Sequence, residues 1–340
     1  MYLHKKIDPQ VLMFFLILFF NQLILTSCKK EGNYNVTLLE DYSVLVTTAD
    51  GVKQIFKPDF MVLANDEDPN KMLRRGDFNY IMPEGTDQGL LYNVPTWGKP
   101  DNFILDPALH VEDGFNPEFD RAYGKGRTAN YFTASPGMKI SAIRAEDNGK
   151  EIIWHFEEYD KFSFVATLTK SNEAEGLPKL HMILTPKSDA WFSVGYLGAP
   201  EISPESTDEI WQGHIWQEKR FPNLPFLSES FRSSIPGTLM TVDGVTTSII
   251  ADPKYIPFEA ITPNSNNSQF GVMIRNEKGN AQSIVFAPVL GNADSKMKSG
   301  EPFIFDVYLF QKRSSLVDAF EYISYNVCGF SNIRRNPTCK

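Results

Sequence analysis

The stretch NGKEIIWHFE, residues 148–157, decides the fold class of this chain. Its first two residues, Asn148-Gly149, are a dipeptide that supplies the positive φ angles of a type I′ turn, and such a dipeptide beside alternating apolar residues predicts a β-hairpin. After the turn, Ile152, Trp154 and Phe156 occupy every second position. Side chains at that spacing point to one face of a strand. The stretch therefore predicts a hairpin that joins a strand over 140–145 to one over 151–157, the second with one buried face.

The same two signals recur along the chain. Asp50-Gly51 and Asp243-Gly244 predict two more type I′ hairpins, and residues 276–280 predict a longer one. About a dozen short antiparallel strands, each apolar on one face, are expected to stack as two sheets. We therefore predict an all-β fold, a large antiparallel β-sandwich with a short C-terminal helix. The predicted core-facing residues include Phe162, Phe164, Ala166 and Leu168, then Leu180, Met182 and Leu184, then Phe303, Phe305, Val307 and Leu309.

The last of these strands has a second apolar face, which carries Ile304, Tyr308 and Phe310. Apolar residues on both faces predict a strand that is covered on both sides.

The C-terminal helix begins with a capping signal. Ser315, with Asp318 three residues later, resembles a capping box. Apolar residues then recur at helical spacing on one stripe, and Gly329 stands where a helix ends. We expect residues 313–340 to be a helix and linker that open a further domain missing from this chain. The stripe consists of Leu316, Phe320, Ile323 and Val327.

The N-terminus reads as an export signal. Lys5 and Lys6 precede an apolar run, and Leu25-Thr26-Ser27-Cys28 resembles the bacterial lipobox, in which the cysteine is lipidated. A transmembrane anchor is the alternative, but it needs about 20 consecutive apolar residues, and Asn21-Gln22 interrupts a shorter run. We therefore predict a lipoprotein signal peptide at 1–27 and a sandwich domain at 28–312, tethered to a bilayer through acyl chains on Cys28.

Composition excludes several kinds of partner and cofactor. The formal net charge is −9, which argues against nucleic acid as a ligand, because nucleic acid demands an excess of Lys and Arg. The three cysteines and five histidines show no metal-ligand spacing. No P-loop, dinucleotide fingerprint or Gly-x-Ser-x-Gly elbow is present, so we expect no cofactor.

The densest group of side chains that could bind a polar ligand lies in residues 208–221. Aromatic rings there can stack under a sugar ring while amide, carboxylate and guanidinium groups bind its hydroxyls. The alternative is that Trp211 and Trp216 fill the core beneath a long excursion, which is the usual place of a Trp side chain. The candidate carbohydrate-binding residues are Trp211, His214, Trp216, Gln217, Glu218 and Arg220, together with Trp97 in the loop-rich stretch 65–130.

Catalytic residues do not emerge from the sequence. A glycosidase needs two carboxylates about 5–9 Å apart, and the 42 acidic residues of the chain offer no way to select a pair.

The lipobox, the strand pattern, the stretch WQGHIWQEKRFP at 211–222 and the closing strand-to-helix step together resemble a known module. They are similar to the N-terminal β-sandwich of exported glycan-degrading lipoproteins of the Bacteroidetes polysaccharide-utilisation type. In those proteins the sandwich, which can be a galactose-mutarotase-like supersandwich, precedes a catalytic (α/α) toroid. The resemblance implies a lipid-anchored protein of the bacterial outer membrane, on its periplasmic face or on the cell surface.

For this chain the resemblance implies an accessory module that binds or shapes carbohydrate, with little or no turnover of its own. Any activity would be that of a glycoside hydrolase or polysaccharide lyase, supplied by a downstream catalytic domain. Two alternatives stay open: a stand-alone, non-catalytic surface glycan-binding lipoprotein, and a structural lipoprotein that binds a protein partner.

Overall fold

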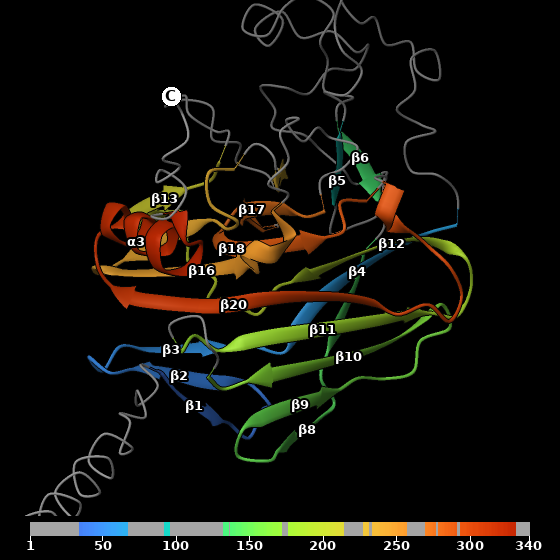
Figure 1. Ribbon diagram of the computed structural model, residues 1–340, viewed down its shortest axis with the longest axis horizontal. Helices are drawn as coiled ribbons and strands as arrows, with labels where there is room; N and C mark the ends of the chain where they lie inside the picture. Colours follow the sequence, from blue (N-terminus) through green and yellow to red (C-terminus); the bar gives the residue numbers. More distant parts are fainter. Residues whose placement is uncertain are drawn as a thin grey trace, which may run out of the picture.

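The fold is all-β, with two large antiparallel sheets stacked face to face (Figure 1). The computed structural model describes residues 34–66, 92–95, 132–135, 137–171, 176–213, 227–230, 233–256, 269–276, 278–290 and 293–330.

The larger sheet has eight strands, and each neighbouring pair is antiparallel. In spatial order they are β13 (Glu209–Trp211), β15 (Leu239–Val242), β16 (Val245–Ala251), β20 (Phe303–Arg313), β11 (Lys179–Pro186), β10 (Phe162–Thr169), β9 (Glu151–His155) and β8 (Arg144–Asp147).

The second sheet has seven strands and lies behind the first in the view of Figure 1. Its order is β14 (Ser228–Glu229), β17 (Gly271–Arg275), β18 (Ala281–Ala287), β12 (Ala190–Tyr196), β4 (Asp59–Asn65) and β7 (Gly137–Ser141), with β19 (Lys296–Met297) paired to β12.

A three-stranded meander completes the second layer. Its strands contribute Val36, Val44, Val46 and Phe56 to the main core. The Trp154 indole Nε1 of the large sheet donates a hydrogen bond to the backbone oxygen of Tyr42 at 2.9 Å. The meander therefore covers part of the inner face of the large sheet. Its strands are β1 (Tyr34–Leu38), β2 (Val44–Thr48) and β3 (Lys53–Phe56), and a separate parallel pair consists of β5 (Tyr92–Pro95) and β6 (Phe132–Ser135).

The predicted period-2 pattern is confirmed by the core. Ile152 and Trp154 are buried, as are all the predicted inward residues of β10 and β11. Burial of this much aliphatic and aromatic surface is the main favourable contribution to folding. On β20, Phe305, Val307 and Leu309 face the core, and Tyr308 and Phe310 are also buried, on the opposite face. Ile304 departs from the prediction, because it is 45% exposed.

The three dipeptide hairpins form, but only one has the predicted turn type. Asp243 and Gly244 both have positive φ, 49° and 69°, as a type I′ turn requires. At the other two hairpins the glycine alone has positive φ, 82° at Gly51 and 89° at Gly149. The Asn148 side chain accepts hydrogen bonds from the backbone N–H of the two residues after Gly149, an Asx-type arrangement that favours a longer turn.

One predicted strand is divided between the two sheets. The sequence suggested a single strand over 140–145, yet β7 ends at Ser141 in the second sheet and β8 begins at Arg144 in the first. Between them, the Ala142 N–H donates to Pro58 and the Ile143 N–H donates to His155. These two bonds belong to different sheets, so the chain passes from the second sheet to the first at this point. Alternation of apolar residues at every second position does not reveal such a change of sheet.

A short helix covers part of the outer face of the large sheet (Figure 1). It begins as predicted, since the Ser315 hydroxyl accepts a hydrogen bond from the Asp318 N–H at 3.2 Å. Its apolar stripe packs on Leu239, Ile250 and Phe310. The elements are α3 (Leu316–Tyr322) and the π-helical turn η10 (Ile323–Val327), and the short 3₁₀ helices are η5 (Pro204–Ser206), η7 (Pro253–Tyr255) and η9 (Ala293–Ser295).

Candidate functional site

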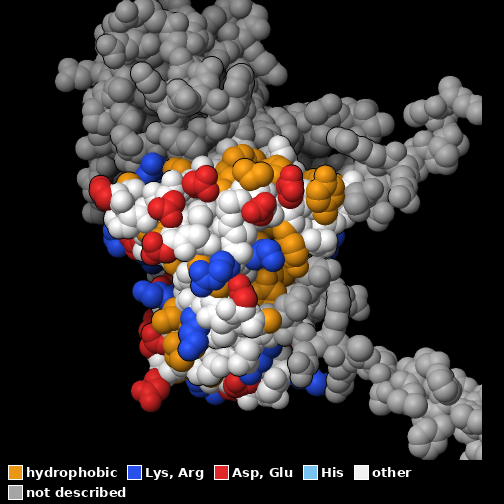
Figure 2. Space-filling view, turned by 90° about the vertical axis from the view of Figure 1, so that its left-hand side faces the viewer, with side chains coloured by type: hydrophobic (Ala, Val, Ile, Leu, Met, Phe, Trp, Pro, Cys, Tyr) orange, Lys and Arg blue, Asp and Glu red, His pale blue; other side chains and the backbone are white. Residues whose placement is uncertain are grey.

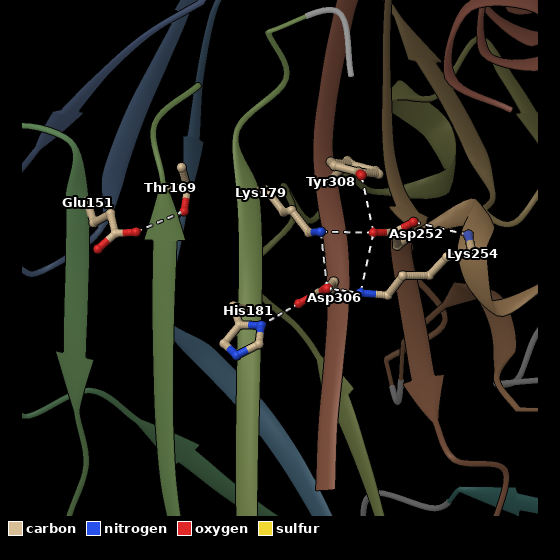
Figure 3. A network of polar contacts seen from close by, with 8 residues as sticks. All are labelled: Glu151, Thr169, Lys179, His181, Asp252, Lys254, Asp306 and Tyr308. Atoms are coloured by element: carbon tan, nitrogen blue, oxygen red, sulfur yellow. Dashed lines mark hydrogen bonds and ion pairs between the residues drawn. The ribbon is translucent and has the colours of Figure 1, made fainter. Parts of the chain in front are cut away.

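Six polar side chains meet on the outer face of the large sheet, beside the part that α3 covers (Figure 3). They come from the neighbouring strands β11 and β20, from Asp252 between β16 and η7, and from η7 itself. We call Lys179, His181, Asp252, Lys254, Asp306 and Tyr308 the outer-face cluster.

Strand register brings the cluster together. On the paired strands β11 and β20, His181 lies opposite Asp306 and Lys179 lies opposite Tyr308. Directly opposite residues in an antiparallel pair have their side chains on the same face, within reach of each other. Asp252 follows β16, where its N–H donates to the backbone oxygen of Asp306 at 3.0 Å.

The segment at η7 is itself fixed by capping. The Asp252 carboxylate accepts a hydrogen bond from the Lys254 N–H at 3.0 Å, as an N-cap residue does. The ring of Tyr255 stacks on Phe305 with the ring centroids 4.4 Å apart. The main chain that carries Asp252 and Lys254 is therefore fixed by two contacts, the capping hydrogen bond and the stacking of Tyr255.

Asp306 is the centre of the cluster. Its side chain is only 4% exposed, and its oxygens contact three cationic or imidazole groups. His181 Nδ1 lies 2.5 Å from Oδ1, Lys179 Nζ lies 3.1 Å from Oδ2, and Lys254 Nζ donates to Oδ2. Burial alone would raise the pKa of the Asp306 carboxyl, but these hydrogen bonds outweigh burial and lower the pKa. Asp306 is therefore held as a carboxylate.

Asp252 carries the second buried negative charge. Its Oδ2 accepts hydrogen bonds from Lys179 Nζ at 2.8 Å and from the Tyr308 hydroxyl at 3.2 Å. For both lysines, burial works against the charged form, yet hydrogen bonds to the aspartates prevail and the pKa rises. Burial and the neighbouring Asp252 raise the pKa of Tyr308 to about 12, so its phenol stays protonated. The two lysines and two aspartates sum to zero charge.

His181 and Lys254 are the most exposed members of the cluster. The His181 side chain is 37% exposed, while its Nδ1 faces the Asp306 carboxylate. Because the carboxylate is an acceptor, Nδ1 carries the hydrogen of this contact. The imidazole is thus held in one orientation by a buried acid. Farther along the same face, the Thr169 hydroxyl lies 3.4 Å from a Glu151 carboxylate oxygen (Figure 3).

Chemically, the cluster offers fixed ammonium donors, an oriented imidazole and neighbouring hydroxyls, all on a sheet face. Groups held by buried ion pairs lose little side-chain entropy when they bind a ligand, so they are preorganised. In the described part of the chain, no group of three or more His, Cys, Asp and Glu is placed to hold a metal ion.

Of the predicted carbohydrate-binding residues, the structure describes Trp211. It lies on β13, where it pairs with Leu239 of β15, and its ring is half-buried. The ring meets Phe320 of α3 edge to face, with the centroids 5.2 Å apart. The remaining candidates lie outside the described residues: Trp97, His214, Trp216, Gln217, Glu218 and Arg220.

Replacing Trp211 with Ala is expected to lower the free energy of unfolding by about 2 kcal/mol, because the ring contact that ties β13 to α3 is lost. Trp211→Phe keeps an aromatic edge for Phe320 and should recover most of the loss. Urea denaturation of the three proteins measures both effects. Unchanged stability with weakened glycan retention would instead place this ring in a ligand site.

The sequence did not single out the outer-face cluster. It did predict that His181 lies on the face of its strand away from the core, and this is confirmed by its exposure and its contact with Asp306. The partners are 125 residues apart along the chain, so only the pairing of β11 with β20 brings them together.

The surface beside the helix carries both signs of charge. Figure 2, which views the molecule from the left-hand side of Figure 1, shows acidic and basic side chains interspersed around a group of hydrophobic ones. Among the described residues, no helix has the length and apolar character that crossing a bilayer requires.

Neither a protein-family model nor a curated protein matches this chain.

Proposed function

We propose that this protein is an exported, lipid-anchored β-sandwich module that binds carbohydrate for a glycan-degrading system. In this proposal the protein shapes or presents the glycan, and a separate catalytic domain cleaves it. The ligand surface is the part of the large sheet's outer face that carries the outer-face cluster.

One observation carries the proposal: a nearly inaccessible carboxylate, Asp306, holds an exposed imidazole and two lysines in place on a sheet face. Burying a carboxylate is costly unless it is paired and hydrogen-bonded. Its presence under an exposed histidine is understandable if the histidine must keep one orientation for a ligand. Sugars are recognised by such oriented donors and acceptors, which match the fixed directions of their hydroxyls.

The test is retention of the purified protein on insoluble plant, algal and host polysaccharides, run beside a reducing-sugar release assay. We expect retention on at least one polysaccharide and little or no sugar release. His181→Ala should lose retention, whereas Lys161→Ala, which removes a surface ion pair with Asp66, should keep it. Absence of retention on every polysaccharide, or full retention by His181→Ala, would overturn the proposal.

The lipid anchor has its own test. Replacing Cys28 with Ser should abolish incorporation of radiolabelled palmitate in a bacterial host and move the protein from the membrane fraction to the soluble fraction, because acyl chains supply the membrane affinity. The control is Cys328→Ser, which should leave labelling unchanged, since Cys328 is buried at the end of the C-terminal helix. Palmitate labelling that survives Cys28→Ser would contradict the lipobox assignment.

The accessory-module form of the proposal differs from a stand-alone glycan-binding lipoprotein in one observable way. An open reading frame that continues in frame after codon 340, into a helical domain with paired carboxylates, is expected for the accessory module. A stop codon at that position would favour the stand-alone form.

A further inference from the structure

The outer face of the large sheet presents its side chains in three rows that run across the strands. Directly paired residues on β9, β10, β11 and β20 define each row, since paired residues in antiparallel strands share a face. The first row is His155, Val165, Ile183 and Ile304; the second is Ile153, Thr167, His181 and Asp306; the third is Glu151, Thr169, Lys179 and Tyr308.

The rows differ in polarity. Val165 and Ile304 in the first row are 38% and 45% exposed, so this row is an aliphatic ledge that meets solvent. The centre of the second row is His181, and the third row presents the Thr169 hydroxyl and the Lys179 ammonium. A ligand lying along the rows would contact aliphatic carbon on one side and hydrogen-bonding groups on the other. A sugar chain, with its C–H faces and hydroxyl edges, has this amphipathic character.

The spacing of neighbouring strands along each row suits a chain of sugars. Neighbouring strands in a sheet lie about 4.8 Å apart, which is close to the length that one pyranose residue adds to a linear glycan. A glycan that runs across the strands therefore passes one strand, with its own side chains in the rows, for each sugar residue. The aligned rows extend over β9, β10, β11 and β20. On β20 the exposed contact for a sugar residue is Ile304, because Asp306 and Tyr308 are buried.

The charge of the cluster selects among glycans. Lys179 and Lys254 are already bonded to Asp252 and Asp306. A uronate or sulfate group would have to compete with those aspartates for the same ammonium groups, and it would bring a third negative charge beside them. An uncharged sugar can instead use the remaining donors and the exposed imidazole without disturbing the ion pairs.

We propose that the outer face of β9, β10, β11 and β20 binds a linear, uncharged glycan that crosses these strands with about one sugar residue per strand. This inference rests on the proposed function, and it adds the ligand's charge, its direction and the length that the surface accommodates.

Isothermal titration of the purified protein tests the inference. The probes are xylo-, manno- and cello-oligosaccharides of two to six residues, with tetra-galacturonate as the acidic comparison. For at least one neutral series, we expect the affinity to rise at least tenfold from the disaccharide to the tetrasaccharide and to level off beyond it.

Two matched variants locate the binding surface. Val165→Glu places a charge on the aliphatic ledge and should weaken tetrasaccharide binding at least tenfold. Met138→Glu makes the same change at an exposed position of β7, in the other sheet, where the native side chain is 48% exposed, and should leave affinity unchanged within twofold. Circular dichroism confirms that both variants fold.

The outcomes separate this inference from the function it rests on. Equal affinity for disaccharide and tetrasaccharide, tighter binding of tetra-galacturonate, or a Val165→Glu protein that binds normally would each overturn the inference while leaving glycan binding intact. Failure to bind any oligosaccharide, together with no retention on polysaccharides, would overturn the proposed function as well.

Discussion

Replacing Asp306 with Asn should lower the free energy of unfolding by about 3 kcal/mol at pH 7, the largest expected effect of a single polar substitution in this protein. The cost arises because the substitution leaves Lys179 and Lys254 beside a neutral amide. Either orientation of that amide also directs a donor at another donor, His181 or a lysine. We expect the low end of the range for a broken buried ion pair, since Lys254 is half-exposed and water screens it.

Chemical denaturation of the wild-type and variant proteins measures this difference, and its pH dependence identifies the cause. The folded pKa of Asp306 lies below its ordinary value of 3.8, so its contribution is fully present above that value and is lost as the pH falls through the folded pKa. The gap between the two proteins should therefore be constant near neutral pH and shrink below about pH 4.

Asp66→Asn is the matched control. It removes a carboxylate whose ion pair with Lys161, at 2.7 Å, is similar in length to the 2.8 Å pair of Lys179 with Asp252 but lies in solvent. An exposed pair contributes about 0–1 kcal/mol, so this variant should be nearly as stable as the wild type. Equal losses for Asp66→Asn and Asp306→Asn would show that burial of Asp306 does not matter.

The fold was predictable from the sequence because its signals are local. Alternation of apolar residues over five to eight positions identified β9, β10 and β11 and their inner faces, and each dipeptide with glycine marked a hairpin. Ser315 and Asp318 likewise identified the start of α3. In each case the residues that determine the local structure lie within one turn or one strand. A short segment of sequence therefore contains all the residues needed to predict it.

What could not be predicted depends on pairing between distant segments. The chain changes sheets between β7 and β8 because the Ala142 N–H donates to Pro58 and the Ile143 N–H donates to His155. These partners belong to different sheets, and neither is close to its donor along the chain. The outer-face cluster has the same origin, since His181 and Lys179 meet Asp306 and Asp252 only through the order β11, β20, β16. The sequence on either side of any one of these residues gives no sign that it differs from an ordinary charged surface residue.

The sequence also singled out residues 208–221 as a candidate binding segment on the strength of their composition. Trp211, the member that the structure describes among the proposed ligand contacts, packs against Phe320. Aromatic residues serve both burial and recognition, and composition does not separate these uses. The position of a residue on its strand and its exposure, as at His181, distinguish a buried side chain from a binding one better than composition does.

Replacing Trp154 with Ala should be the most destabilising change in the large sheet, at about 4 kcal/mol. The indole is fully buried among residues of the main core, and its Nε1 donates to the Tyr42 backbone oxygen at 2.9 Å. The substitution leaves a cavity and removes the partner of a buried carbonyl. Trp154→Phe should recover most of the packing but not the hydrogen bond, and Ile153→Ala, a neighbour on the outer face, should cost far less.

Hydrogen exchange distinguishes a general loss of stability from loss of this particular link. Trp154 joins the large sheet to the meander of β1, β2 and β3, and Gln311 makes a second link by donating to the Val46 oxygen at 2.8 Å. If Trp154 is the main link, the amides of the meander should lose protection in Trp154→Phe before those of β10 and β11 do. Uniform loss across both sheets would mean that the meander and the sandwich unfold as one cooperative unit. In that case Gln311 and the shared core would hold the meander without the indole hydrogen bond.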